Sequence, residues 1–429
     1  MPTRTLTTAL LIGALMGIWS TPAGAWGDRS SGPAAIVIDW NQLVNELAFA
    51  EDQSLTFKGA RADAMMHIAQ HDALNAIDPA YEQFSFHGDD RKAHPVAAAA
   101  QAAHDVVVAE YPERRAEVDA LLAEQLAGVR PAKAKAAGIE LGRQAAAAIL
   151  ADRRGDGYDF QGTYTFRVGP GQYQTTPPFD GFVLQPGFRF ARPFALSSPG
   201  RLRPKGPPAL KSRAYAEAFD EVKEMGRVDS TSRTADQTGY ALWWMEFAES
   251  SVNRLARELA TQHRLGLSEA ARLFAQLGVG IYDGYIAVWD SKFEYNHWRP
   301  YTAVREAGSD GNPRTVADQA WEPLRTTPPF PEYVSAHSVA CNVSLGVLAE
   351  TLGDRTRFTM ATTTAPPGMP TRSFKSFTAA GDECADSRVR LGWHFRYATN
   401  AGIRLGRKVA DYVVGRFFRP QCKHRSLCT

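Results

Sequence analysis

Apolar side chains recur at helical spacing along most of the chain, and polar turn residues separate the periodic segments. The predicted helices with the clearest pattern cover residues 61–77, 96–109, 113–126, 132–150, 234–249 and 267–298. No segment alternates convincingly as a ladder of strands would. The pattern therefore predicts an all-α fold built as two helical bundles.

The stretch from 153 to 208 has a different character. Proline and glycine cluster at Pro170-Gly171, Pro177-Pro178 and Pro186-Gly187, which predicts a long irregular connection. Loops of this length in a compact protein are often functional, as a lid or the wall of a pocket. We predict an N-terminal bundle over residues 26–160 and a loop region over 161–209. A C-terminal bundle with the functional site covers 210–420, and a tail covers 421–429.

The first 25 residues form a separate unit. Arg4 precedes an apolar run over residues 6–19, and Ala23-Gly24-Ala25 is typical of a cleavage site. These features predict a secretory signal peptide, cleavage near Ala25 and export to the periplasm or the outside. No later apolar run is long enough to cross a bilayer. A net charge of +2 without a dense basic block argues against a nucleic-acid partner.

Export makes the four cysteines candidates for disulfides. Cys422 and Cys428 lie close together in a polar tail, where a small disulfide-closed loop is expected. Cys341 and Cys384 can form a second bridge. Their spacings match no zinc motif, and the sequence leaves the pairing open.

Lys292 and Arg299 are the first candidate functional residues. A helical stripe of apolar side chains leads up to them, and both fall on its inward face. Two buried cations are costly unless an anion lies between them. Pro300 disfavours helical geometry at Arg299, so the helix is expected to end there. This stretch predicts an inward-facing anion site.

A second cluster begins at Ser335, which follows a proline-rich run and precedes a helical pattern. Ser335 is a good N-cap, so the amides of Ala336 and His337 are expected to point out of a helix N-terminus, where an oxyanion binds readily. His337 is then placed to donate or accept a proton at that anion.

The third cluster is Ser387-Arg388 with His394, which starts another helical stripe. A single buried histidine is usually a satisfied core residue. Together, however, the three clusters supply three cations, a hydroxyl, a helix N-terminus and two histidines. That set suits phosphate or vanadate, because arginine forks match oxyanion geometry and lysine adds a point charge.

A further group, Asp63, His67 and His71, recurs every four residues on one predicted helix face. Such spacing can hold a metal, but the helix lacks the glutamate of a metalloprotease-type motif. We interpret these three residues as structural.

The order and spacing of the three clusters resemble the shared signature of type-2 phosphatidic acid phosphatases and vanadium-dependent haloperoxidases. In that superfamily Lys-x6-Arg-Pro precedes Pro-Ser-Gly-His, which precedes Ser-Arg-x5-His. Lys292-x6-Arg299-Pro300 and Ser387-Arg388-x5-His394 match completely. Val334-Ser335-Ala336-His337 departs from the signature at its first and third positions, and an alanine amide can still donate to an oxyanion.

The motif surroundings resemble the haloperoxidase branch. Trp289 and Phe330 occupy positions where the chloroperoxidase type carries Trp and Phe. Phosphatases typically continue His-x3-Asp, and that aspartate orients the histidine, but Ala398 stands at this position. Another group must then set the tautomer of His394.

The resemblance implies a vanadate cofactor with His394 as the apical ligand of vanadium. It implies that Lys292, Arg299 and Arg388 neutralise the vanadate oxygens, together with Ser335 and the Ala336 amide. His337 is implied as general acid–base and Lys292 as the group that polarises bound peroxide. Hydrogen peroxide, halide and a small organic acceptor are the implied partners, and hypohalous acid is the product.

Two alternatives remain open. A phosphatase would use the same residues, with His394 as nucleophile in a phosphohistidine and His337 as acid for the leaving group. A non-catalytic oxyanion-binding protein would account for the cations but not for the two histidines. The sequence leaves halide preference, organic substrate, oligomeric state and the resident oxyanion open.

Overall fold

The computed structural model describes residues 32–52 and 57–421. The predicted signal peptide with its cleavage site near Ala25, and the predicted loop of Cys422 and Cys428, lie outside this part of the chain. The helices are α2 (Ala35–Asp52), α3 (Phe57–Ile77), α4 (Pro95–Glu110), α5 (Arg115–Ala127), α6 (Ala132–Asp152), α7 (Arg213–Met225), α8 (Ala235–Trp243), α9 (Ala248–Gln262), α10 (Leu267–Tyr295), α11 (Pro300–Arg305), α12 (Ala336–Leu352), α13 (Phe377–Arg390) and α14 (Arg396–Arg416).

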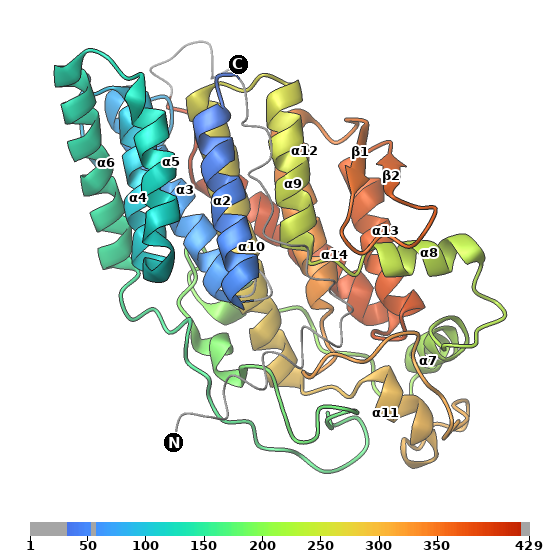
Figure 1. The fold of residues 1–429 in the computed structure, drawn as a ribbon. Coiled ribbons are helices and arrows are strands. Elements are labelled where there is room, and N and C mark those ends of the chain that lie inside the picture. The colour runs from blue at the N-terminus through green and yellow to red at the C-terminus, as the bar shows by residue number, and fades with distance from the viewer. Residues whose placement is uncertain (1–31, 53–56, 422–429) are drawn as a thin grey trace.

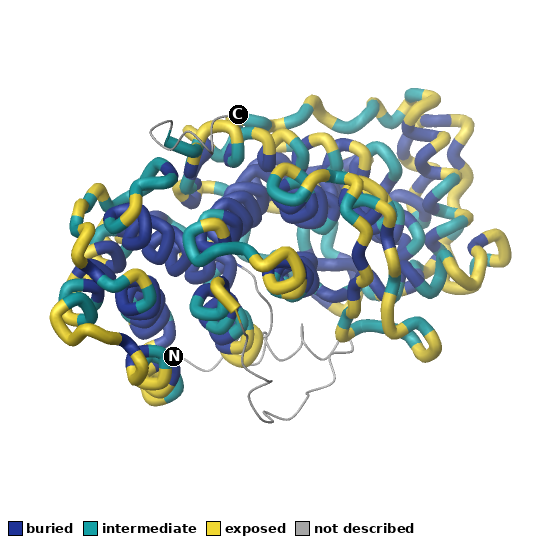
Figure 2. Tube along the Cα trace, turned by 90° about the horizontal axis from the view of Figure 1, so that it is seen from above, coloured by how far each residue is buried: buried dark blue, intermediate teal, exposed yellow. Residues whose placement is uncertain are grey.

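Helix α10 is the centre of the molecule (Figure 1). It packs against α3 on the side of the first bundle, which holds α2 to α6, and against α12 and α14 on the other side. From Leu273 to Phe293 every residue of α10 is buried, as expected for a helix that is covered all round. Figure 2 shows the buried segments gathered inside a shell of exposed ones.

One apolar core runs through both bundles. It includes Val37 and Leu141 of the first bundle, Ile286 of α10 and Val409 of the second. The all-α architecture with helical bundles is as predicted, whereas the predicted bundle boundaries stay a prediction. Among the described residues, none of the helices combines the length and apolarity needed to cross a bilayer.

Three local predictions were wrong. A short antiparallel hairpin, β1 (Phe358–Ala361) with β2 (Thr371–Phe374), occurs where no strands were expected. Helix α10 ends at Tyr295 rather than at residue 298, because Asn296 adopts the left-handed conformation that asparagine tolerates at helix ends. The predicted helix 234–249 is broken between α8 and α9.

Glycines let α14 lie close to α12. A Cβ on Gly402 would come within 2.9 Å of the Ser335 carbonyl oxygen, and one on Gly406 within 2.7 Å of that of Val339. These distances are too short for a side chain, so glycine is required for this approach. The approach brings the N-terminal half of α14 against the start of α12.

The segment between α6 and α7 is irregular, as predicted, with short 3-10 turns at Pro186–Phe190 and Pro199–Leu202. The buried carboxylate of Asp283 in α10 accepts hydrogen bonds from the amides of Phe194, Ala195 and Leu196 at 2.6 to 2.8 Å. These bonds tie the segment to the central helix.

Candidate active site

The helix end at Asn296 positions the first two cations. Lys292 and Arg299 are both fully buried. Arg299 has extended backbone angles and precedes Pro300, the first residue of α11. Proline has no N–H group, and the N–H of the first residue of a helix has no partner within the helix, so proline loses no hydrogen bond there. The predicted inward orientation of both cations is therefore present in the fold.

The loop before α12 holds these cations through its backbone. Lys292 Nζ donates to the carbonyl oxygens of Pro331 and Glu332 at 2.8 and 3.0 Å, which leaves one of its three N–H bonds. Arg299 Nε donates to the Phe330 carbonyl oxygen at 2.8 Å. The ring of Phe330 lies 4.9 Å from Lys292 Nζ and 4.8 Å from the Arg299 guanidinium carbon.

Ser335 caps α12, as predicted. Its Oγ accepts from the Ser338 amide at 3.4 Å and from the Ser338 hydroxyl at 2.8 Å. Ala336 and His337 begin the helix, where the first amides have no partner within the helix. His337 is partly buried, and its Nε2 is buried without a hydrogen-bond partner among the described residues.

Arg388 comes from the last turn of α13 and is 1% exposed. Its Nη2 donates to the Trp244 carbonyl oxygen at 2.6 Å, and its Nε donates to Ser387 Oγ at 2.9 Å. Trp244 lies just past the end of α8, so the break between α8 and α9 frees the carbonyl that holds Arg388. Burial lowers the pKa of Arg388 to about 9.

The ring of His394 lies between the carboxyl group of Glu332 and the guanidinium of Arg299. Its Nδ1 is 2.9 Å from Oε1 of Glu332, and its Nε2 is 3.1 Å from Nη1 of Arg299. A guanidinium can only donate, so Nε2 must carry the lone pair and Nδ1 the proton, which is donated to Glu332. The same Glu332 oxygen accepts from the Phe395 amide at 3.0 Å.

The three sequence clusters meet around His394. Burial lowers the pKa of His394 well below its ordinary value, and Arg299, Lys292, Arg388 and His337 act in the same direction. All four groups are therefore within electrostatic reach of its ring. Their convergence from α10, α12, α13 and the segment before α11 is the feature that the motif spacing predicted.

Two buried nitrogen atoms in this cluster have no protein partner in the described part of the chain: the donor Arg299 Nη2 and the ring nitrogen His337 Nε2. Burial lowers the pKa of Lys292 well below its usual range, and the neighbouring Arg299 lowers it further. A buried, cationic pocket with a free N–H donor is suited to an oxyanion, because the anion pairs with the charges and accepts the hydrogen bond. The residues present fit vanadate or phosphate.

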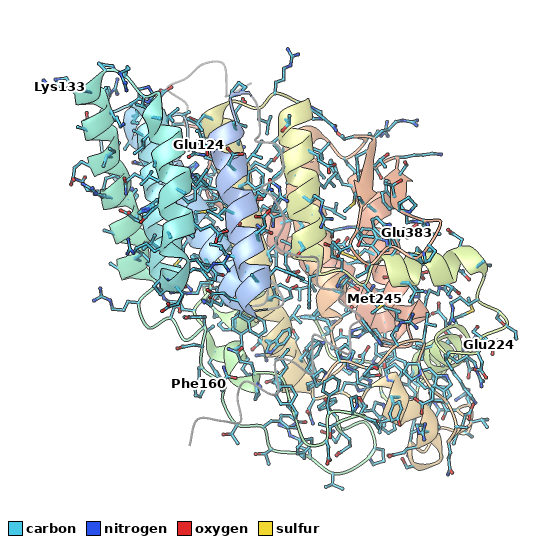
Figure 3. The ribbon with its side chains drawn as sticks, in the orientation of Figure 1. Glu124, Lys133, Phe160, Glu224, Met245 and Glu383 are labelled. Carbon is cyan, nitrogen blue, oxygen red and sulfur yellow. A yellow bond between two sulfur atoms is a disulfide. The ribbon has the colours of Figure 1, made fainter. Side chains whose placement is uncertain are left out.

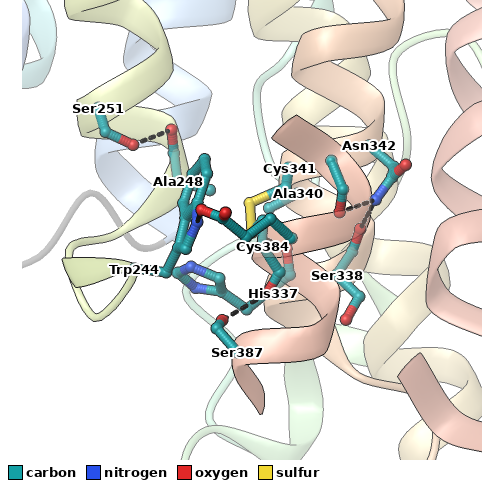
Figure 4. Close-up of a disulfide and its surroundings, with 12 residues drawn as sticks. Trp244, Ala248, Ser251, His337, Ser338, Ala340, Cys341, Asn342, Cys384 and Ser387 are labelled. Atoms are coloured by element: carbon teal, nitrogen blue, oxygen red, sulfur yellow. Dashed lines mark hydrogen bonds between the residues drawn. A yellow bond between two sulfur atoms is a disulfide. The ribbon is translucent and has the colours of Figure 1, made fainter. Parts of the chain in front are cut away.

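A disulfide joins two of the motif helices. Cys341 and Cys384 are bonded, and the sulfurs lie beside the ring of His337 (Figure 4). Cys341 lies one helical turn after His337, and Cys384 lies one turn before Arg388. The bond therefore ties the acid–base candidate to one of the cations, and it answers the pairing question that the sequence left open for these two cysteines.

The histidines of α3 make structural contacts. His67 Nδ1 is 2.8 Å from Gln70 Oε1, and Asn41 Nδ2 is 3.1 Å from its Nε2. His71 Nε2 is 3.0 Å from the Glu82 carbonyl oxygen. These side-chain and backbone contacts fit the structural interpretation.

Glu332 is the site residue that the sequence analysis missed. Burial raises its pKa to about 8, and the charges of Lys292 and Arg299 act in the opposite direction. It supplies the carboxylate partner of His394 that Ala398 cannot supply. The available signal was a glutamate within Pro331-Glu332-Tyr333, a stretch predicted to lie beside the cap of α12.

Comparisons with known proteins agree with this geometry. A family model described as "VCPO second helical-bundle domain" matches residues 272–421. A vanadium chloroperoxidase from Curvularia inaequalis is 32% identical over 166 residues, which is 31% of this chain and 27% of that protein. The match therefore spans only about a quarter of the length of that protein.

Similar solved structures cover nearly the whole chain. A bacterial vanadium-dependent iodoperoxidase has a TM-score of 0.76 and 25% identity, and the match covers 89% of this chain and 96% of that one. The holo form of a bacterial vanadium-dependent chloroperoxidase has a TM-score of 0.65 and 17% identity over 94% of this chain and 96% of its own. The second likeness concerns the fold alone.

Proposed function

Because this chain belongs to the vanadium-dependent haloperoxidase family, we propose that it binds vanadate and uses hydrogen peroxide to oxidise a halide to hypohalous acid. The observation that carries the proposal is the buried cluster of Lys292, Arg299 and Arg388 around His394, with unpartnered nitrogens at Arg299 Nη2 and His337 Nε2. The overall reaction joins halide, peroxide and a proton to give hypohalous acid and water.

In this proposal the three cations bind the vanadate oxygens, together with Ser335 and the Ala336 amide. His394 Nε2 would be the ligand of vanadium, since its lone pair is directed away from Glu332. Vanadate held in such a pocket supplies a Lewis acid that makes peroxide reactive toward halide. Burial of the site excludes bulk water from the reacting atoms.

In the proposed reaction His337 transfers protons and Lys292 polarises the peroxide. His337 Nε2 accepts a proton from hydrogen peroxide and returns it when water leaves, because burial and the nearby Arg388 keep its ring neutral at rest. The remaining N–H of Lys292 donates to the peroxide oxygen that the halide attacks, which withdraws electron density from that oxygen.

A phosphatase is the second candidate, and one contact favours it. Ala398 argued against a phosphohistidine enzyme, because the nucleophile lacked its carboxylate. Glu332 now provides that carboxylate at 2.9 Å. The same pocket could therefore hold a phosphate ester, with His394 as nucleophile and His337 as acid.

We also propose that the protein is exported. The disulfide between Cys341 and Cys384 supports this, since such bonds persist in oxidising compartments. The segment over residues 6–19 with its Ala-Gly-Ala site is the second support.

The test compares two activities of one phosphate-free preparation. Bromination and iodination of a dione reporter are measured with peroxide, with and without orthovanadate. Vanadate-dependent turnover that is lost in His394→Ala supports the haloperoxidase. Hydrolysis of a phosphate ester that vanadate inhibits, without halogenation, would transfer the assignment to the phosphatase.

A further inference from the structure

A cavity of about 320 Å³ lies beside the C-terminal end of α10, outside the cluster around His394. Most of its lining comes from the irregular segment, including Phe160, Tyr164, Arg167, Arg189 and Phe190. Phe293 of α10 also lines it. This volume is at the small end of the range for small-molecule sites.

Four aromatic side chains line the cavity. Phe160 and Phe190 are 53% and 68% exposed, and their ring centres are 6.4 Å apart. Tyr164 packs edge-on against Phe293 at 5.9 Å. Phe160 lies on the loop below the helices, whereas Lys133 marks the far end of the first bundle (Figure 3). Large rings left in water around a hollow are typical of a binding surface.

The charge of the cavity is positive and partly uncompensated. Arg189 Nη2 lies 3.2 Å from Glu294 Oε2, so this charge is paired. The guanidinium of Arg167, in contrast, makes no hydrogen bond or ion pair with any residue that the structure describes. A free guanidinium beside aromatic faces suits an aromatic ligand with a carboxylate, because the fork binds the carboxylate and the rings stack.

Contacts through Tyr164 and Tyr173 lead from the wall of this cavity toward the cations. The Tyr164 hydroxyl donates to Asn296 Oδ1 at 2.5 Å, and the Tyr164 ring lies 6.0 Å from that of Tyr173. The Tyr173 hydroxyl is buried without a partner among the described residues. Burial raises the pKa of Tyr173, and the charge of Arg299 opposes this, so Tyr173 is within electrostatic reach of the oxyanion cluster.

We propose that this cavity, with Arg167 as its anion-binding residue, binds the organic halogen acceptor, and that the acceptor is a phenol bearing a carboxylate. The inference rests on the proposed haloperoxidase function. In the step it serves, hypohalous acid gives its halogen to a ring carbon, the ring carbon loses its proton, and water is released. Binding here holds an electron-rich ring beside the source of the oxidant, which raises its effective concentration.

The test uses 4-hydroxybenzoate as the probe and unsubstituted phenol and the dione as comparisons. Binding of 4-hydroxybenzoate to the vanadate-treated protein is measured by calorimetry without peroxide or halide. Arg167→Gln is expected to weaken binding roughly ten-fold and to raise KM for 4-hydroxybenzoate in halogenation by the same factor. Halogenation of phenol and of the dione should not change.

Two further variants complete the design. Phe160→Ala is expected to weaken binding of both 4-hydroxybenzoate and phenol, since it removes a stacking face. Arg143→Gln, at an exposed position of α6, is the matched control for the loss of one positive charge and should bind 4-hydroxybenzoate as the parent does. No measurable binding, or equal binding in Arg167→Gln and the parent, overturns the inference. If the parent protein does not halogenate the dione at all, the proposed function is overturned instead.

Discussion

The ring nitrogen Nδ1 of His394 lies 2.9 Å from Oε1 of Glu332, a residue 62 positions earlier in the chain. Both side chains are buried, and the carboxylate also accepts the Phe395 amide. This contact fixes the ring orientation and its tautomer, which leaves Nε2 as the ring nitrogen that carries the lone pair. In this chain a glutamate from the loop before α12 thus does what an aspartate one turn after the histidine does in phosphatases.

Replacing Glu332 should weaken vanadate binding. Glu332→Ala is expected to raise the dissociation constant of orthovanadate by about 10- to 100-fold, because ligand histidines depend on such partners. Glu332→Gln keeps an acceptor for Nδ1–H and should lose less. Calorimetric titration with vanadate measures both values.

A second substitution distinguishes loss of the carboxylate that positions His394 from a general loss of stability. Ala398→Asp in the Glu332→Ala background places a carboxylate one helical turn after His394 and is expected to restore part of the vanadate affinity. Thermal unfolding of each variant is the control for stability. Unchanged vanadate affinity in Glu332→Ala would refute the positioning role.

His337 should affect turnover far more than binding. His337→Ala is expected to lower kcat for halogenation by about 10²- to 10⁴-fold, the usual contribution of a positioned acid–base group. Its effect on vanadate affinity should be small, since the three cations remain. His394→Ala, in comparison, should lose both. Equal loss of affinity in the two variants would contradict this division of roles.

The disulfide should stabilise the second bundle. The bond closes a loop with a sequence separation of 43 residues, which corresponds to about 4 kcal/mol in the chain-entropy estimate. Cys341→Ser with Cys384→Ser should therefore lower the free energy of unfolding by several kcal/mol in urea denaturation. Adding a reductant should destabilise the parent protein by more than it destabilises the double variant.

The same double variant should also halogenate more slowly, because the bond ties His337 to Arg388 through one helical turn on each side. Turnover is compared at a temperature where both proteins are fully folded. Full activity of the folded double variant would show that packing alone holds the two helices in place.

Glu249 should make stability depend on pH. It is buried and accepts a hydrogen bond from the Tyr285 hydroxyl at 2.6 Å, and burial raises its pKa from 4.5 to about 7. The folded state then binds the proton more tightly than the unfolded state does. Its stabilising contribution is complete below pH 4.5 and is lost as pH rises to 7, a change of about 3 kcal/mol.

Glu249→Gln carries no such proton and keeps an acceptor for Tyr285. The free energy of unfolding of this variant, relative to the parent, is therefore expected to increase between pH 5 and pH 8 in urea denaturation. Glu140→Gln, on the exposed face of α6, is the control for removing a carboxylate. A constant difference between Glu249→Gln and the parent across this range would be evidence against a protonated Glu249.

Local patterns in the sequence were enough to predict most helices and the buried cations that meet around His394. Helical periodicity depends on neighbours within one or two turns, so the inward orientation of Lys292 could be inferred from its own helix. The same applies to the cap at Ser335. The spacing of the three motifs indicated that they act together.

Only the tertiary structure decided which groups complete the site. Glu332 meets His394 across 62 positions, and the Trp244 carbonyl meets Arg388 across 144. The latter contact depends on a break between α8 and α9 that their continuous helical pattern hid. Helix propensity and periodicity reflect only residues that are close in sequence. These contacts instead depend on how α10, α12, α13 and α14 pack. The sequence by itself therefore determined which residues carry the charge, and packing determined which partners hold them in place.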